Sequence, residues 1–317
     1  MHLRNLFSRQ TTRQSVSVQS ADPLESIGVD TSKTWNNMVA NAELSGVSNP
    51  SQAPATLSTR DPLPPNPLGE IRFEHIEKRY SNGVTALNDV SFDVQPGQFV
   101  TIVGPSGCGK STLLRIAAGL SKPTAGRATV PRTKPGIVFQ DATLLPWRTV
   151  LQNVELVGEL DGVPKDKRDA EAMKVLYNVD LEKFADQYPG QLSGGMKMRV
   201  SIARAMAASP SVMLFDEPFG ALDEITRLHM QIELQRIIHD HPFTGLFITH
   251  SIEESVFLGS RVIVMAARPG RVIDDIQVNA PYPRPASFRF EPEFTKIVER
   301  VSNALLEGSN HGNDDAQ

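Results

Sequence analysis

Short apolar runs separated by longer amphipathic stretches form the main pattern of this chain. The apolar runs cover residues 99–103, 137–139, 212–215 and 246–249. An apolar run without alternation is typical of a strand that is buried on both faces of a parallel sheet. Between these runs, residues 167–179 and 225–240 have the spacing of helices. Strands that alternate with helices predict an α/β fold with a largely parallel sheet.

Two further strands are predicted before this core, and a helical region interrupts it. Residues 71–76 and 90–94 alternate apolar and polar positions, as strands with one buried face do. A helix is predicted over 111–120, directly after the run at 99–103. The stretch from about 141 to 195 is mostly helical in pattern and predicts a subdomain.

The two ends of the chain differ from this folded core. Residues 1–69 are rich in Ser, Pro, Asn and Thr, which predicts a disordered extension and a stiff linker, with a short helix possible over 35–44. Arginines without acidic residues over 1–21 leave a transit peptide as the alternative. The folded domain is expected over 70–278. A C-terminal extension follows over 279–317, with a last helix over 292–306 and a disordered tail from 307.

The composition gives no sign of nucleic-acid binding, of disulfide bonds within the chain or of a membrane span. The net charge of −4 gives no global indication of nucleic-acid binding, and the single cysteine, Cys108, excludes an intrachain disulfide framework. No stretch approaches the roughly 18 apolar residues that cross a bilayer. Any role at a membrane is therefore expected to depend on a partner.

One glycine-rich segment predicts a phosphate site, since it has a glycine, four residues, and then Gly-Lys-Ser. It reads Gly104-Pro105-Ser106-Gly107-Cys108-Gly109-Lys110-Ser111, followed by Thr112. Glycines let backbone N–H groups surround phosphate oxygens, and the following helix directs its positive end at the same anion. Lys110 would add charge at the phosphates and Ser111 would bind Mg²⁺. The alternative is a tight strand-to-helix turn, and Cys108 is predicted to be a small spacer.

A carboxylate pair follows the apolar run at 212–215. Asp216 and Glu217 stand where the strand ends, and ligands bind at the carboxyl ends of strands in open α/β sheets. Asp216 would hold Mg²⁺, and Glu217 would act as general base toward water. Alone, the pair would be an ordinary solvated strand end.

A second candidate anion site precedes this pair at Ser193-Gly194-Gly195. The glycines before a helix expose backbone N–H groups. The alternative is a helix that simply uses Ser193 as its N-cap. The order of the three segments resembles that of ABC-type ATPases, whose signature motif these residues match.

The resemblance covers about residues 71–278 and implies further site residues. Tyr80 matches the adenine-stacking aromatic, Gln140 the glutamine that reaches Mg²⁺, and His250 the switch histidine. Residues 220–223, ending in Asp223, match the loop that contacts the opposite subunit. The family's fold combines a parallel sheet core with an antiparallel β subdomain and a helical subdomain. ATP and Mg²⁺, the latter on Ser111, Gln140 and Asp216, are the implied cofactors.

Within the family, the chain looks most like the ATPases of nitrate, sulfonate and taurine importers. Residues 139–141, 144–147 and 268–271 support this likeness. Two features depart from the pattern, the long N-terminal extension and Lys197-Met198, where the family usually has Arg-Gln. We expect Met198 to weaken a polar contact there.

The resemblance also implies partners and a mechanism. Two copies, or one copy and a paired ATPase subunit, would enclose two ATP molecules, each between one chain's phosphate loop and the other's Ser193, Gly194, Gly195 and Asp223. Lys110, Glu217 and His250 would be the catalytic residues. Residues 141–150 would grip a membrane permease at the cytoplasmic face of the cell membrane, and a solute-binding protein would take part indirectly. Trp147 is the candidate anchor, with a core tryptophan as the alternative.

Other classes of ATPase fit less well. A DNA-maintenance ATPase would need long coiled-coil heptads between the phosphate loop and the signature, and a translation-associated protein would need two cassettes. A small-molecule kinase would lack the signature. A non-hydrolytic regulatory subunit would lack Glu217 or His250.

Overall fold

The computed structural model describes residues 68–131, 133–267 and 269–314. The predicted N-terminal extension up to residue 67, its possible helix over 35–44 and the transit-peptide alternative lie outside these residues and stay predictions. None of the helices in the described part of the chain is both long enough and apolar enough to span a membrane.

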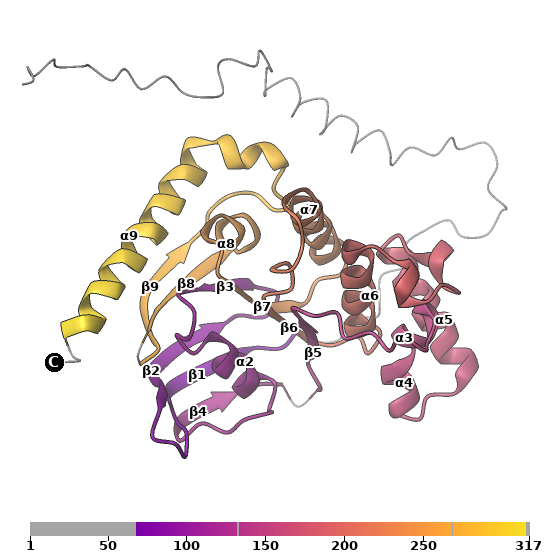
Figure 1. Cartoon of the computed structure of the whole chain (residues 1–317), viewed down its shortest axis with the longest axis horizontal. Helices are drawn as coiled ribbons and strands as arrows, with labels where there is room; N and C mark the ends of the chain where they lie inside the picture. The colour runs from indigo at the N-terminus through magenta and orange to yellow at the C-terminus, as the bar shows by residue number, and fades with distance from the viewer. Residues whose placement is uncertain (1–67, 132, 268, 315–317) are drawn as a thin grey trace, which may run out of the picture. The chain divides into compact units, whose positions relative to one another are not determined.

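A six-stranded sheet forms the centre of the described domain (Figure 1). In spatial order its strands are β5 (Gly136–Phe139), β6 (Val212–Asp216), β7 (Thr244–Thr249), β3 (Phe99–Val103), β8 (Arg261–Ala266) and β9 (Arg271–Gln277). The first five are parallel and β9 runs antiparallel to β8. The predicted largely parallel sheet is confirmed.

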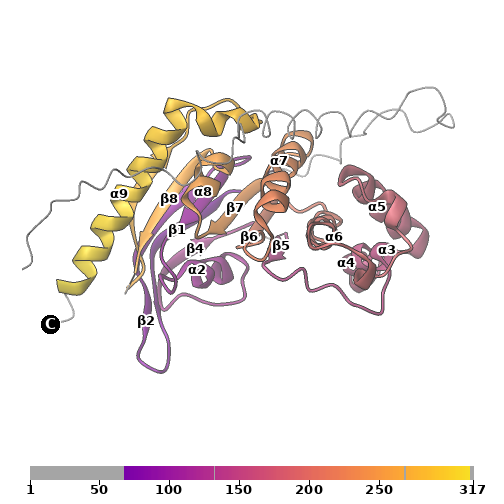
Figure 2. The ribbon, with the colours of Figure 1, turned by 45° about the horizontal axis from the view of Figure 1, so that its top comes forward.

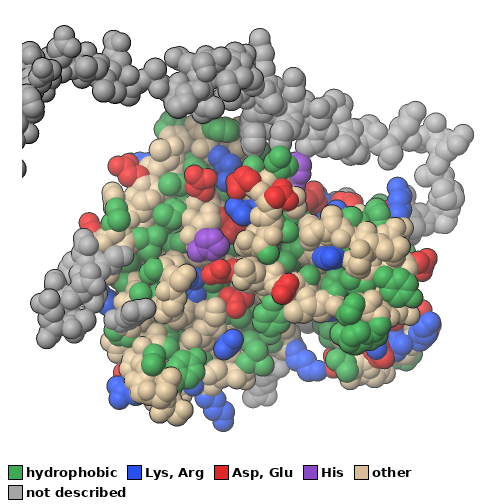
Figure 3. Space-filling model, in the orientation of Figure 1, with side chains coloured by type: hydrophobic (Ala, Val, Ile, Leu, Met, Phe, Trp, Pro, Cys, Tyr) green, Lys and Arg blue, Asp and Glu red, His purple; other side chains and the backbone are tan. Residues whose placement is uncertain are grey.

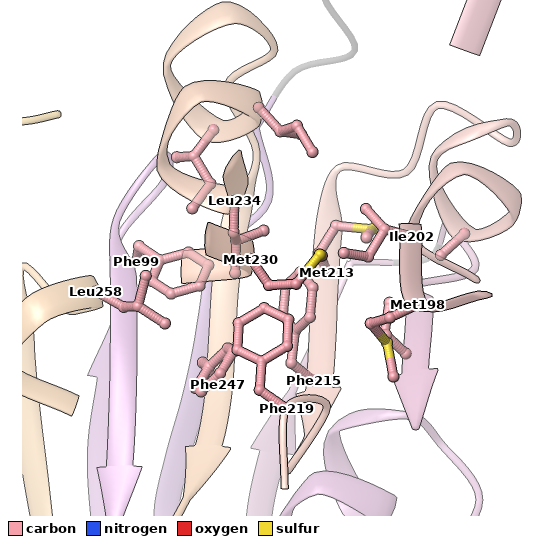
Figure 4. Close-up of a cluster of buried hydrophobic side chains, with 14 of the residues drawn as sticks. Phe99, Met198, Ile202, Met213, Phe215, Phe219, Met230, Leu234, Phe247 and Leu258 are labelled. Atoms are coloured by element: carbon pink, nitrogen blue, oxygen red, sulfur yellow. The ribbon is translucent and has the colours of Figure 1, made fainter. Parts of the chain in front are cut away.

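Both faces of this sheet are covered, which explains the uninterrupted apolar runs. On β6, Met213 and Phe215 belong to one buried cluster, whereas Val212 and Leu214 belong to the other. Figure 4 shows the first cluster, where Phe215 lies beside Phe247, with ring centroids 5.6 Å apart. Because all four side chains over 212–215 are buried, the sequence shows no alternation there.

An antiparallel sheet covers one face, as the fold class predicted. It has the order β2 (Thr85–Val94), β1 (Ile71–Arg79) and β4 (Ala125–Thr129). Helix α2 (Lys110–Ala117) packs against both sheets. The apolar positions of β1, among them Phe73, are buried beneath it. The alternating pattern in the sequence therefore marks one buried and one exposed face.

Helical elements fill the region predicted as a helical subdomain over about 141–195, and the last of them continues past that predicted end. Its elements are α3 (Val150–Val154), α4 (Leu156–Leu160), α5 (Lys165–Asn178), the short turns η2 (Glu182–Phe184) and η3 (Pro189–Gln191), and α6 (Gly194–Met206). Helices α7 (Glu224–Asp240) and α8 (Ile252–Leu258) lie on the side of the large sheet opposite to α2 (Figure 2).

The C-terminal segment corrects one prediction. After η4 (Ala286–Phe290), helix α9 runs over Pro292–Asp314 and so continues past the predicted end at Leu306 into the predicted disordered tail. The helix packs along β8 and β9. At Gly308 an added Cβ would lie 2.5 Å from Ile273 Cδ1, so the glycine permits close contact with β9. Tertiary packing thus outweighs the low helix propensity of glycine.

Candidate functional site

The candidate site forms where three neighbouring parallel strands end. Strand β7 pairs with β3 on one side and with β6 on the other. The glycine-rich segment follows β3, Glu217 follows β6, and His250 follows β7. Segments that are far apart in the sequence therefore meet at the carboxyl edge of the sheet, where open α/β sheets bind ligands.

The loop after β3 has a backbone that only glycine adopts easily. Gly109 has φ 94° and caps the start of α2. A Cβ at this position would lie 2.6 Å from Leu87 Cδ2 and 2.7 Å from the Ala86 carbonyl oxygen. The loop therefore approaches β2 closely while its N–H groups lead into the N-terminus of α2, an arrangement suited to phosphate. Cys108 is buried, and burial raises the pKa of its thiol, which fits the predicted role of spacer.

Lys110 is almost fully buried in this loop despite its charge. Its ammonium donates to the carbonyl oxygens of Gly104 and Pro105, at 2.8 and 3.2 Å. It also lies 3.8 Å from Glu217 Oε1. The loop and the strand-end carboxylate thus surround one cation, which places positive charge where the helix also directs its positive end.

Asp216 and Ser111 form a pair suited to a cation. The Ser111 hydroxyl donates to Asp216 Oδ1 at 3.0 Å. Burial raises the pKa of Asp216, and the hydrogen bond from Ser111 opposes this shift. A divalent cation would stabilise the desolvated carboxylate, and hydroxyl and carboxylate oxygens are ligands that Mg²⁺ accepts. The described residues contain no group of three or more His, Cys, Asp or Glu that could hold a metal alone, so further ligands would come from elsewhere.

Gln140 lies at the end of β5, close to the loop that follows Glu217. A Cβ added at Gly220 would be 3.2 Å from Gln140 Nε2. The Gln140 side chain is exposed. Its amide can therefore face a ligand at this edge of the sheet.

Glu217 and His250 are brought together by a strained backbone. Glu217 has φ 49°, which is uncommon outside glycine, and its N–H donates to the Ile248 carbonyl oxygen of β7 at 3.0 Å. Its Oε2 lies 3.2 Å from His250 Nδ1. Strain of this kind persists only where the surroundings hold it, and it clusters at functional sites.

Tyr80 stands beside the same loop, from the end of β1. Its hydroxyl lies 3.2 Å from Thr112 Oγ1 in α2. The ring is partly exposed, and Lys78 Nζ lies 5.4 Å from its centroid. An exposed ring next to the phosphate loop can stack on a planar base.

The predicted second anion site is a capped helix N-terminus. Ser193 caps α6, because its hydroxyl accepts from the Met196 N–H at 3.3 Å. Ser193 and Gly194 are exposed, whereas Gly195 is buried against α7. Among the described contacts, Ser193 makes no hydrogen bond to the phosphate loop of its own chain. The N-cap role of Ser193 is therefore compatible with an exposed backbone at the start of α6.

The two glycines of this segment differ in what surrounds them, which gives a stability prediction. A Cβ at Gly195 would lie 2.8 Å from Thr226 Cγ2, whereas at Gly194 the nearest atom is Leu222 Cδ2 at 3.4 Å. Gly195→Ala is expected to lower the free energy of unfolding by about 1 to 3 kcal/mol through overpacking. Gly194→Ala is expected to be neutral or slightly stabilising, since alanine favours helices. Urea unfolding of both variants measures the difference, and equal stabilities would contradict the packing role of Gly195.

Asp223 also caps a helix, and a neighbouring arginine supports the loop before it. Its carboxylate accepts from the Thr226 N–H at 3.0 Å, and this bond lowers the pKa of Asp223. Arg227 donates to the carbonyl oxygens of Phe219 and Leu222, at 3.3 and 2.8 Å. Arg227 was not among the site residues predicted from the sequence. Arg227 stands four residues after Asp223, the N-cap of α7, and this spacing was the feature of the sequence that could have indicated its role.

The loop over 141–150 holds Trp147 outward. The tryptophan is 71% exposed, which excludes the core alternative. Buried Asn153 accepts from the Leu145 N–H at 2.8 Å and donates to the Leu145, Arg148 and Thr149 carbonyl oxygens, while Arg204 holds the Ala142 and Thr143 carbonyl oxygens. Figure 3 shows hydrophobic side chains gathered on the helical subdomain. The tryptophan thus stands on a loop that is tied down from inside.

Met198, which departs from the family pattern, and Gly270, which supports it, both face inward. Met198 is buried in the apolar cluster of Figure 4, and the expected weakening of a polar contact at this position stays a prediction. Gly270 pairs with β2 through Ala86 and Asn88. A Cβ there would lie 2.0 Å from the Cys108 carbonyl oxygen, so this glycine lies directly against the phosphate loop. Arg268 lies outside the described residues.

Known proteins are similar to this chain in sequence and in fold. The family model described as "ABC transporter" matches residues 87–220. A putative ATP-binding protein of Brucella abortus (strain 2308) is 48% identical over 243 residues, which cover 74% of this chain and 93% of that protein. The taurine import ATP-binding protein of Rhizobium johnstonii is 44% identical, covering 72% of this chain and 91% of that protein. The aliphatic sulfonates import ATP-binding protein of Burkholderia ambifaria is 42% identical, covering 81% and 79%.

Solved structures agree with these relatives. An ATP-binding cassette described as a dimer in a post-hydrolysis state, bound to ADP and Pi, superposes with a TM-score of 0.57 at 33% identity. It covers 67% of this chain and all of that chain. A component of a cbiONQ transporter complex from Clostridium perfringens superposes with a TM-score of 0.62 at 26% identity, covering 74% of this chain and 96% of that chain.

Proposed function

Because this chain belongs to the ABC transporter family and is one of its ATP-binding, ATP-hydrolysing subunits, we propose that it energises the import of a small anion such as a sulfonate, taurine or nitrate. The observation that supports ATP hydrolysis most directly is the meeting of Lys110, Asp216, Glu217 and His250 at one edge of the sheet. The solute class rests on the relatives named for taurine and aliphatic sulfonates.

ATP would lie along the loop at 104–111. Backbone N–H groups of the loop and of the α2 N-terminus would bind the phosphates, with Lys110 adding a charge at the β- and γ-phosphates. Tyr80 would stack on the adenine, and Thr112 beside it would line the same site. Ser111, Gln140 and Asp216 would hold a magnesium ion, which would neutralise phosphate charge when bound.

Glu217 would act as the general base. Its carboxylate would accept a proton from water as the water oxygen bonds to the γ-phosphorus and the bond to the bridging oxygen breaks, leaving ADP and phosphate. His250, 3.2 Å from this carboxylate, would orient it and contact the γ-phosphate. Lys110 would stabilise the charge that develops on the transferring group.

The second half of each site would come from another subunit. Ser193 and Gly194 are exposed at a helix N-terminus, and the hydrogen bond described for the Ser193 hydroxyl is the one within its own helix, to the Met196 N–H. Their N–H groups, with Gly195 and Asp223 beside them, suit an anion presented from outside. We therefore infer that two copies, or this chain and a paired ATPase subunit, enclose two ATP molecules between them.

The permease would dock on the loop over 141–150, which would bring this chain to the cytoplasmic face of the cell membrane. An exposed tryptophan on a loop that Asn153 and Arg204 hold in place is suited to be the centre of an interface. A solute-binding protein would deliver the anion to the permease from the other side.

Solute uptake tests this assignment through Trp147. In cells that depend on this chain, Trp147→Ala is expected to lower ATP-dependent uptake of labelled taurine at least about tenfold, since such anchors dominate interfaces. ATP hydrolysis by the isolated chain should stay within about twofold of wild type, because the loop lies outside the ATP site. Leu306→Ala, at an exposed apolar residue of α9, is the matched control. Normal uptake by Trp147→Ala would contradict the docking site. Competition of unlabelled sulfonates or nitrate with labelled taurine for uptake identifies the solute class.

A further inference from the structure

Behind the catalytic edge, the space between α7, α8 and the C-terminal segment is filled with buried polar side chains. They are Gln231 and Gln235 of α7, Glu254 of α8 and Arg284 of the C-terminal segment. Buried polar and charged groups destabilise a fold unless they are paired. Gln231 donates to Glu254 at 2.8 Å, and Gln235 accepts from the Arg284 N–H at 2.7 Å, so these bonds tie the three elements together.

Arg289 of η4 connects to Glu254 of α8 through one amide. The Arg289 guanidinium donates to Gln231 Oε1, and Gln231 Nε2 donates to Glu254 Oε1 at 2.8 Å. The guanidinium also lies over the Phe257 ring of α8, 3.9 Å from its centroid. The neutral amide of Gln231 thus links the Arg289 guanidinium to the buried Glu254 carboxylate, with its oxygen accepting from one and its nitrogen donating to the other.

Glu254 in turn belongs to the turn that holds His250. Its N–H donates to the hydroxyl of Ser251, the N-cap of α8, at 3.3 Å. The Ser251 N–H donates to Thr249 Oγ1 at 3.0 Å. His250 lies between Thr249 and Ser251 in the chain. The position of the first turn of α8 therefore determines where the His250 imidazole lies.

Arg284 holds the other end of the same helix. It is 3% exposed, and it donates to the carbonyl oxygens of Phe257 and Gly259, both at 2.9 Å. Burial lowers its pKa to about 10, so it stays charged at neutral pH. A cation at a helix C-terminus is favourable. Arg284 therefore supports the last turn of α8, whereas Arg289 supports the first turn through Gln231 and Glu254.

We propose that Arg289 is a positioning residue for ATP hydrolysis, which keeps His250 within reach of Glu217 by holding Gln231, Glu254 and the first turn of α8. The proposal rests on the proposed function, because it concerns the same reaction. It makes the C-terminal segment, which follows His250 in the sequence, a part of the support for the catalytic edge.

Full-length Arg289→Met tests the proposal. Methionine keeps an apolar stem over Phe257 and removes the charge and the donor to Gln231. We expect kcat for ATP hydrolysis to fall about 10- to 100-fold, as small displacements of catalytic groups do, with KM for ATP within about twofold. Arg289→Lys, which keeps a cationic donor, should recover part of the loss. Arg300→Met is the matched control, since Arg300 pairs with Asp274 on β9 and lies outside this network.

A direct readout separates positioning from stability. In protein with ¹⁵N-labelled histidine, Arg289→Met is expected to shift the ring signals of His250, assigned with His250→Gln, and to leave those of His75 on β1 in place. A lowered kcat with unshifted His250 signals would overturn the proposal, as would a lowered melting temperature with unchanged kcat. If wild-type protein hydrolyses no ATP, the proposed function fails. An active wild type with an equally active Arg289→Met rejects this inference alone.

Discussion

ATP hydrolysis is expected to fall about 100- to 1,000-fold when Lys110 is replaced by alanine, because one preorganised group that meets developing charge typically contributes that much. The Lys110 ammonium lies within the loop that would receive the phosphates, 2.8 Å from the Gly104 carbonyl oxygen and 3.8 Å from Glu217 Oε1. Alanine removes this charge from a site where water is largely excluded. Phosphate release by purified protein, followed over time, measures the loss.

The control for this experiment is a lysine of the same chain outside the site. Lys134 is exposed and pairs with Asp161 at 2.6 Å. Lys134→Ala should keep wild-type turnover, since exposed pairs contribute little. Because Lys110 also holds two loop carbonyls, melting temperatures of both variants must be compared. Wild-type turnover by folded Lys110→Ala would refute the assignment of the phosphate site.

A stable ATP-dependent dimer is the expected result of Glu217→Gln. The amide keeps the shape of the carboxylate beside His250 and cannot accept the proton from water. ATP should then bind without being cleaved and hold two chains together through both phosphate loops and both copies of residues 193–195. Sedimentation should show a dimer with Mg-ATP and a monomer without nucleotide. A monomer at saturating ATP would contradict the shared site.

A second substitution in the Glu217→Gln background tests which residues face the other chain. Ser193→Arg places a bulky cation at the exposed start of α6 and should return the protein to a monomer with ATP. Since Ser193 is also an N-cap, about 1 kcal/mol of stability should be lost as well, and the melting temperature checks that the fold survives. Asn303→Arg, on the exposed side of α9, is the control and should keep the dimer. A dimer that persists with Ser193→Arg would place the interface elsewhere.

The fold class and most members of the candidate site could be predicted from the sequence. Residues 104–111 are contiguous, so the spacing of their glycines, Lys110 and Ser111 was visible without any tertiary information. Four of the six strands of the large sheet were visible too, because burial on both faces makes a strand apolar along most of its length, as over residues 212–215 of β6. Asp216 and Glu217 were predicted because they stand where such a strand ends, whereas His250 was predicted only through the resemblance to ABC-type ATPases.

Features that depend on contacts between distant segments could not be predicted from the sequence. A single tryptophan has no periodicity, so the exposure of Trp147 followed from the turn that Asn153 holds. The length of α9 depends on Gly308 meeting Ile273 of β9, which helix propensity does not register. The same holds for Gly195 against Thr226.

The buried arginines show the physical reason most clearly. In the sequence, Arg284 and Arg289 stand among prolines and phenylalanines and have the composition of an exposed, irregular segment. Their partners are carbonyl groups at the end of α8 and the amide of Gln231 on α7. Backbone carbonyls are present at every residue, so no residue type marks the ones that will accept a buried cation. Their pairing is determined only when the chain folds and the C-terminal segment packs against α7 and α8.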